Sequence, residues 1–258
     1  MLRGLWNAAT GMRAQQQKID VTANNIANVN TTGFKKKSTV FRDLVYQSIE
    51  RKGNAAAPAR AGQNPSTVGV GSAVASIRSD FAPGSYVQTD RSADLAIVGE
   101  GFFQVTLPAG RTAYTRDGGF SRDSAGHFVT QRGLELVFPD LPGGEYDIHI
   151  SPEGTVTAVY PNEETLVLGS LELAYFSNPH GLEQIGDNVL AATEASGEPA
   201  VGIQAGNTRV LQGYLEGSNV DLGEEMVRLV TGQRAFELNS RALRTADEMW
   251  SIANQLRR

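Results

Sequence analysis

Apolar side chains recur with a seven-residue period at both ends of the chain. Near the N-terminus the steps alternate between three and four residues, along Leu2, Leu5, Ala9, Met12, Gln16, Ile19, Ala23 and Ile26. Near the C-terminus every seventh residue is large and apolar, at Leu222, Leu229, Phe236, Leu243 and Trp250. Although such stripes often only pack a helix onto its own core, this period is also that of helices that pair with a partner helix. The pattern therefore predicts two terminal helices and suggests a subunit that assembles.

The ends of these helices carry recognisable signals. The first is expected to run from Leu2 to about Val29, where asparagines crowd the sequence and Gly33 can adopt the positive φ that stops a helix. The second is expected to begin after Asp221, a good N-terminal cap with Glu224 three residues later, and to run to about Leu256.

The middle of the chain has a different period. Short apolar runs are separated by glycine- and aspartate-rich turn sequences, which is typical of antiparallel strands in a barrel or sandwich. The clearest runs are 95–98, 102–105, 128–130, 148–150, 156–159, 166–176 and 210–215. The predicted fold class is therefore α+β, with long terminal helices that form a coiled-coil layer on assembly and a mostly antiparallel β central domain.

Two stretches lie between the first helix and the strands. Phe34 to about Tyr46 fits either a second helix or an extended piece, and 47–71 has no apolar period, so we interpret it as a long loop or arm. The resulting domain prediction is a helical assembly segment at 1–46, an arm at 47–73, a β-rich region at 74–215 and a second helical assembly segment at 216–258.

Composition excludes several kinds of chemistry. The net charge of −5 disfavours nucleic acid as a partner, because phosphate contacts need clustered positive charge. The absence of cysteine removes disulfides, thiol nucleophiles and sulfur-ligated metal sites. No apolar run approaches the roughly 18 residues of a membrane span, so no direct membrane insertion is expected. Polar residues at 13–18 interrupt any cleavable signal, and these two observations alone predict a cytoplasmic protein.

No catalytic or metal-binding constellation emerges, so we expect no enzyme activity and no cofactor. The histidines at 127, 149 and 180 fall in separate segments. We interpret the run Lys35–Lys37 as a solvated basic turn rather than an anion site, and carboxylates such as Glu224 and Glu225 as surface or cap residues.

Five sequence motifs, in order along the chain, resemble those of one family. Residues 23–35 read ANNIANVNTTGFK, and residues 99–105 and 114–118 read GEGFFQV and YTRDG. Residues 213–220 and 233–240 read GYLEGSNV and QRAFELNS. Together these resemble the rod and hook family of bacterial flagellar axial proteins over essentially the whole chain. The length, the segment after Tyr46 and the single central region favour the distal-rod members.

The resemblance implies a structural subunit that polymerises into the tubular distal rod, which links the motor to the hook. It implies export by the flagellar type III apparatus without a cleaved signal, which overturns the cytoplasmic prediction and places the protein at the basal body outside the cytoplasm. The implied partners are further copies of the chain, other rod and hook subunits and the export apparatus, with a surrounding bushing ring as a further candidate.

The candidate assembly residues follow from the two stripes and the motif. The subunit-assembly set is Leu2, Leu5, Met12, Ile19, Ile26, Leu222, Met226, Leu229, Phe236, Leu243 and Trp250, and the motif set is Asn24, Asn25, Asn28, Thr32, Gly33 and Phe34. Several positions of the first stripe are small or polar, so we expect both ends to fold only on assembly. Positions Gln233, Ser240, Asp247 and Asn254 predict a hydrated edge on the second helix.

Two alternatives remain open at the level of sequence. One is a proximal rod subunit or a short hook-type protein of the same family. The other, from a different class, is a hydrolase or carbohydrate-binding β domain with helical tails, which would require a polar pocket with paired catalytic groups.

Overall fold

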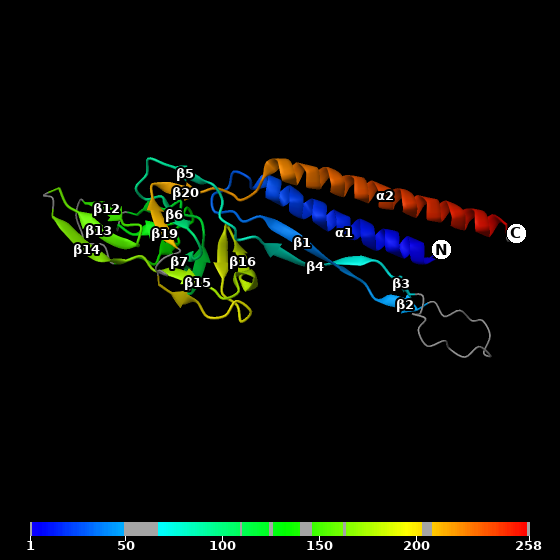
Figure 1. Cartoon of the computed structure of the whole chain (residues 1–258), viewed down its shortest axis with the longest axis horizontal. Helices are drawn as coiled ribbons and strands as arrows, with labels where there is room; N and C mark the ends of the chain where they lie inside the picture. Colours follow the sequence, from blue (N-terminus) through cyan, green and yellow to red (C-terminus); the bar gives the residue numbers. More distant parts are fainter. Residues whose placement is uncertain are drawn as a thin grey trace. The chain divides into compact units, whose positions relative to one another are not determined.

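A computed structural model of the chain describes residues 2–48, 67–108, 110–123, 126–139, 146–161, 164–202 and 208–256. Most of the predicted arm at 47–73 lies outside these ranges, as does the side chain of Leu2. The described part contains two long helices and many short strands, and none of its helices is long and apolar enough to cross a membrane. Figure 1 shows the chain coloured in sequence order, from blue at the N-terminus to red at the C-terminus.

The helices and strands have the following bounds: α1 Leu2–Ala27, β1 Lys37–Asp43, β2 Tyr46–Ser48, β3 Thr67–Gly69, β4 Ser72–Ser79, β5 Tyr86–Gln88, β6 Leu95–Val98, β7 Phe102–Thr106, β8 Thr112–Thr115, β9 Ser121–Arg122, β10 Phe128–Val129, β11 Glu135–Leu136, β12 Asp147–Ile150, β13 Thr155–Val159, β14 Thr165–Ser170, β15 Leu173–Tyr175, the 3₁₀ turn η1 Pro179–Gly181, β16 Glu183–Gly186, β17 Val189–Ala191, β18 Ala200–Val201, β19 Arg209–Gln212, β20 Tyr214–Glu216 and α2 Leu222–Gln255.

The chain divides into two compact units. We call Met1–Ile26, Lys37–Arg78 and Leu222–Arg258 the helical unit, and Ala27–Lys36 with Ser79–Asp221 the β unit. The second half of the ANNIANVNTTGFK motif therefore folds with the strands, although its first half is helical.

The helical unit pairs α1 with α2 in opposite directions (Figure 1). A side chain at Gly11 would meet Asn239 at 3.2 Å, and one at Gly232 would meet Ile19 at 3.1 Å, so glycine permits close packing at both points. Two short two-stranded sheets, β1–β4 and β2–β3, belong to the same unit. The Asn7 amide donates to the carbonyl of Gly69 and so ties α1 to β3.

The β unit confirms the predicted antiparallel architecture. Its larger sheet follows the order β16–β17–β8–β7–β11–β10–β9, with β15 beside both β7 and β18. Further sheets are β12–β13–β14, β19–β6 and β20–β5, and every pairing with an assigned register is antiparallel. The core is formed by apolar side chains from these strands, including Leu95, Ile97, Phe103, Val105, Phe120, Leu171, Leu173 and Val210.

The α+β fold class is confirmed, but some boundaries differ from the predicted ones. The segment 1–46 is helical only as far as Ala27, and Lys37–Asp43 is a strand, which is the extended of the two alternatives for that stretch. Thr39, Val40 and Phe41 are β-branched or aromatic residues and favour a strand when a neighbouring strand is present. The predicted arm at 47–73 contains strand residues at both ends, in β2, in β3 Thr67–Gly69 and at the start of β4, and Glu216 ends β20 rather than beginning the helical segment.

The helix stop behaves as predicted at Gly33, whose φ is +66°. A Cβ atom at this position would lie 2.6 Å from the backbone nitrogen of Asp117. Glycine is therefore required here both by the backbone conformation and by the close approach of another segment.

Candidate assembly site and the buried motif clusters

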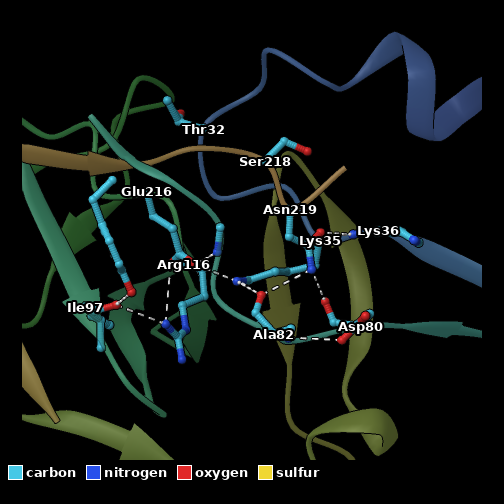
Figure 2. Close-up of polar contacts among 12 residues, drawn as sticks. Thr32, Lys35, Lys36, Asp80, Ala82, Ile97, Arg116, Glu216, Ser218 and Asn219 are labelled. Carbon is cyan, nitrogen blue, oxygen red and sulfur yellow. Dashed lines mark hydrogen bonds and ion pairs between the residues drawn. The ribbon is translucent and has the colours of Figure 1, made fainter. Parts of the chain in front are cut away.

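A buried ion network joins three of the motifs within the β unit (Figure 2). The Lys35 ammonium donates to Oε1 of Glu216 at 2.6 Å, and the Arg116 guanidinium donates to Oε2 of the same carboxylate at 3.3 Å. The side chains of Lys35, Arg116 and Glu216 are 5%, 4% and 0% exposed. One carboxylate thus holds two cations that come from segments far apart in the sequence.

Neutral backbone groups add further hydrogen bonds to this network. Lys35 also donates to the carbonyl of Ala82 at 2.9 Å, and Arg116 donates to the carbonyl of Gly99 at 2.7 Å. The backbone N–H of Gly84 donates to Glu216 Oε1 at 3.0 Å. Buried charges are tolerated when they are paired and hydrogen-bonded, and both conditions hold for the Lys35–Glu216 pair.

Burial lowers the pKa of Lys35 below its ordinary value of 10.5, because the desolvated ammonium is disfavoured. The nearby Glu216 carboxylate opposes this effect and Arg116 adds to it. The interpretation of Lys35 as part of a solvated basic turn is therefore wrong. Its partner lies 181 residues away, so nothing local in the sequence indicated the burial.

Asn219 binds two neighbouring segments of the β unit. Its Oδ1 accepts from the backbone N–H of Lys36 at 2.7 Å, and its Nδ2 donates to the carbonyls of Asp80 and Ala82. The N–H of Asp80 in turn donates to the carbonyl of Lys36 at 2.8 Å. Figure 2 shows this arrangement next to the Lys35–Glu216 pair. The GYLEGSNV motif thus positions the end of the N-terminal motif through both Glu216 and Asn219.

Asn25 links separate segments of the helical unit, as Asn219 does in the β unit. Its Oδ1 accepts from the Lys37 N–H at 2.9 Å, and its Nδ2 donates to the Lys37 carbonyl at 2.8 Å, so the amide satisfies both backbone groups of one residue. The same Nδ2 lies 3.0 Å from Oε2 of Glu225 on α2. Asn25 is 1% exposed and Glu225 is fully buried in the first turn of α2. Of the two positions expected for Glu225, surface or cap, the surface one is therefore wrong.

The rest of the motif set is divided between interior and surface. Gly33 and Phe34 are buried, Asn28 and Thr32 are half-buried and Asn24 is exposed. Thr32 donates its hydroxyl hydrogen to Asp117 at 2.8 Å and its carbonyl accepts from the Asn188 amide at 2.7 Å. The motif is therefore mostly a packing element, and Asn24 is its outward-facing member.

The face of α1 that is buried is not the apolar stripe. The buried positions of α1 are small or polar, at Ala8, Ala14, Thr22 and Asn25. Of the predicted assembly residues on this helix, Leu5, Met12, Ile19 and Ile26 are half-buried, and the side chain of Leu2 lies outside the described part. The larger apolar side chains thus keep part of their surface available.

The assembly residues of α2 are also incompletely covered. Leu229, Phe236 and Leu243 are half-buried, whereas Leu222, Met226 and Trp250 are 40%, 51% and 46% exposed. Three of the four positions predicted to form a hydrated edge, Gln233, Asp247 and Asn254, are exposed and Ser240 is half-buried. Exposed apolar side chains on paired helices are typical of surfaces that bind a further partner.

Among the described residues, no three histidine or carboxylate side chains are grouped so as to hold a metal ion. The expected absence of a cofactor stays a prediction.

Three family models match successive parts of the chain. The model "Flagella basal body rod protein" matches residues 5–35, the model "Flagellar hook protein FlgE/F/G D1 domain" matches 96–158, and the model "Flagellar basal body rod FlgEFG protein C-terminal" matches 211–256. These ranges include the Asn25, Arg116 and Glu216 clusters.

Whole-chain relatives decide the family. A protein of Borreliella burgdorferi named "Flagellar basal-body rod protein FlgG" is 43% identical over 264 residues, which covers 100% of both chains. The chain belongs to the flagellar basal-body rod family. Rod proteins of the same name from Agrobacterium fabrum and Caulobacter vibrioides are each 41% identical over 263 residues and are covered over 99% and 100% of their length.

Family membership gives the buried clusters a common interpretation. In this rod-family chain, Lys35, Arg116 and Glu216 lie in three separate sequence motifs that fold into one network. The motifs are thus linked by intramolecular contacts that shape the subunit. The larger apolar side chains of α1 and α2 take no part in these buried networks and stay partly exposed.

Proposed function

We propose that this chain is the subunit that polymerises into the distal rod of the flagellar basal body. The whole-length similarity to proteins named as basal-body rod proteins supports this proposal most directly. The family consists of structural rod proteins, so we propose a structural role without catalysis. The alternative of a β-domain hydrolase has no paired catalytic groups to support it in the described part of the chain.

The assembly contacts would come from the two long helices. Polymerisation needs surfaces that remain free after the subunit has folded, and the helical unit has them in Leu222, Met226 and Trp250. We propose that these residues, with Leu5, Met12, Ile19, Ile26, Leu229, Phe236 and Leu243, pack against helices of neighbouring copies as an inner coiled-coil layer. Leu2, by its position in the same stripe, is assigned the same role.

The remaining parts of the proposal concern location and partners. The subunit would reach the periplasmic side by flagellar type III export. Its neighbours there would be further copies of itself and other rod and hook subunits, with a bushing ring around it. We assign no nucleic acid, membrane insertion or cofactor to it.

Imaging of basal bodies from a strain that lacks this gene tests the proposal. We expect a basal body without its distal rod and without a hook, which reintroduction of the gene restores. A complete rod that lacks only a hook would instead indicate a hook-type protein. A rod truncated nearer the motor would indicate a proximal subunit.

A further inference from the structure

The two units carry charge of opposite sign. Over its sequence ranges the helical unit contains 15 Lys or Arg and 8 Asp or Glu residues, a net charge of +7. The β unit contains 8 Lys or Arg and 20 Asp or Glu residues, a net charge of −12. The net charge of the whole chain is only −5 because the positive charge of one unit partly cancels the negative charge of the other. Identical chains with such a division attract one another when the positive unit of one copy meets the negative unit of the next.

The helical unit contains a pocket suited to receive negative charge. It measures about 230 Å³ and is lined by residues of α1, β1 and the first turns of α2. Cationic side chains line it at Lys18, Lys37 and Arg228, and hydroxyl groups line it at Thr22, Ser38 and Thr39. One carboxylate, that of Glu225, also lines it and pairs with Arg228. Ammonium, guanidinium and hydroxyl groups are the usual donors to a carboxylate.

The two lysines of this pocket are not neutralised by any residue in the described ranges. Arg228 pairs with Glu224 at 2.6 Å and with Glu225 at 3.4 Å, so its charge is largely compensated. Neither the Lys18 nor the Lys37 ammonium forms an ion pair with any residue that the structure describes. Both side chains are half-buried, so each lines the pocket and is still accessible to solvent.

We infer that this pocket, centred on Lys18 and Lys37, binds carboxylates of the acidic β unit of a second copy of the chain. The inference rests on the proposed polymerisation and adds the polar part of the contact. Apolar stripes can slide along one another by a turn, whereas an ion pair in a pocket fixes one register. The pocket would therefore select the axial position at which successive copies join.

The test measures the monomer concentration that remains in equilibrium with polymers of the purified full-length protein, at about 0.1 M and about 1 M salt. Because the Debye length falls from about 10 Å to about 3 Å over this range, wild-type polymers should leave more free monomer at high salt. At low salt, Lys18→Glu and Lys37→Glu should each raise the free monomer concentration by at least about twofold, and both variants should respond less to salt.

Two controls separate the pocket from the general charge of the unit. Lys18→Arg retains the positive charge and should behave as the wild type does. Arg13→Glu changes the net charge of the helical unit by the same amount, but Arg13 is an exposed residue of α1 outside the pocket. It should raise the free monomer concentration less than Lys18→Glu.

Several outcomes would overturn the inference. Equal effects of Arg13→Glu and Lys18→Glu would show that net charge acts without the pocket. Polymers whose stability does not change with salt or with Lys18→Glu would refute the electrostatic contact, but they would leave the proposed function intact. Inorganic phosphate that binds the wild type but not Lys18→Glu, with no effect of the variant on polymerisation, would make the pocket a small-anion site. A wild type that never polymerises would contradict both proposals.

Discussion

The Lys35 ammonium and the Glu216 carboxylate lie 2.6 Å apart, and both side chains are buried. Lys35 ends the motif that begins in the last turn of α1, and Glu216 ends the strand β20, which precedes α2. Because the pair connects segments 181 residues apart in sequence, it closes the β unit near its two chain ends. Its loss should affect the folding of that unit as a whole.

Glu216→Gln should strongly destabilise the β unit. The substitution leaves the Lys35 and Arg116 charges buried without their anionic partner, a change that typically costs about 3–5 kcal/mol. Denaturant unfolding of the full-length protein, followed by circular dichroism of its β signal, measures the loss. Glu172→Gln removes an exposed carboxylate of the same unit and serves as the control. Equal unfolding midpoints for the two variants would contradict this role of the network.

The stability of the β unit should change with pH in the alkaline range. Because the pKa of Lys35 is lowered in the folded protein, the unfolded chain binds more protons below 10.5. The free energy of unfolding therefore rises as the pH increases from the folded pKa towards 10.5. Burial raises the pKa of Tyr86 and Tyr114, so the unfolded chain loses their protons first and stability falls above pH 10.0.

Unfolding midpoints measured at increasing pH should accordingly rise and then turn over near pH 10.0. Lys35→Met removes the titrating ammonium and should abolish the rising part while retaining the fall. If the unfolding midpoint of Lys35→Met rises with pH by the same amount, another titrating group causes the rise.

Asn25→Ala should loosen β1 from α1 and α2. Both backbone groups of Lys37 lose their partner, and a buried unsatisfied group costs about 1–3 kcal/mol. Faster amide hydrogen exchange at Lys37 in the assembled state is the expected signature. The exposed Gln17 provides a control in the same helix, since Gln17→Ala should leave that rate unchanged.

Two glycines should respond in opposite ways to alanine. Gly33→Ala places a Cβ atom in a left-handed conformation 2.6 Å from the Asp117 nitrogen and should cost more than the about 1–3 kcal/mol of backbone strain alone. Gly4 lies in α1 with nothing within 4 Å of an added Cβ atom, so Gly4→Ala should favour the helix by about 1 kcal/mol. Thermal unfolding and helical circular dichroism distinguish the two. Equal shifts in one direction would contradict the close approach at Gly33.

Phe236→Asp should block rod assembly without unfolding the β unit. The half-buried ring lies on α2, and a carboxylate there would introduce an uncompensated charge into the proposed helix layer. The measurement is rod length in electron micrographs of basal bodies from cells that express only this variant. Gln233→Asp, at an exposed position of the same helix, should leave rods of normal length. Rods of normal length with Phe236→Asp would refute the assignment of this residue.

The sequence was sufficient for the features that depend on local pattern. The seven-residue stripes predicted both helices, and the asparagine-rich stop predicted the positive φ of Gly33. The turn sequences between short apolar runs predicted antiparallel strands. Each of these signals lies within a few residues of the structure it specifies.

Other features depend on partners far away in sequence and could not be predicted. The run Lys35–Lys37 looks solvated, but Lys35 enters the interior because Glu216 is there to neutralise it. Glu225 looks like a first-turn surface residue, but the Asn25 amide binds it in the interior. Lys35, Glu216 and Asn25 lie in the motifs that resemble the family, and this was the only sequence signal for their contacts. Glu225 lies outside these motifs.

The small-residue face of α1 has a consequence for the proposed rod wall. Where Gly11 and Gly232 lie, the side chains of Asn239 and Ile19 pack directly on the backbone of the opposite helix, so the spacing of α1 and α2 is set by one side chain at each point rather than by two interleaved ones. A layer of such helix pairs has little freedom to thicken or thin under load. Torsional stiffness would then originate within each subunit, and the contacts between subunits would have only to transmit it.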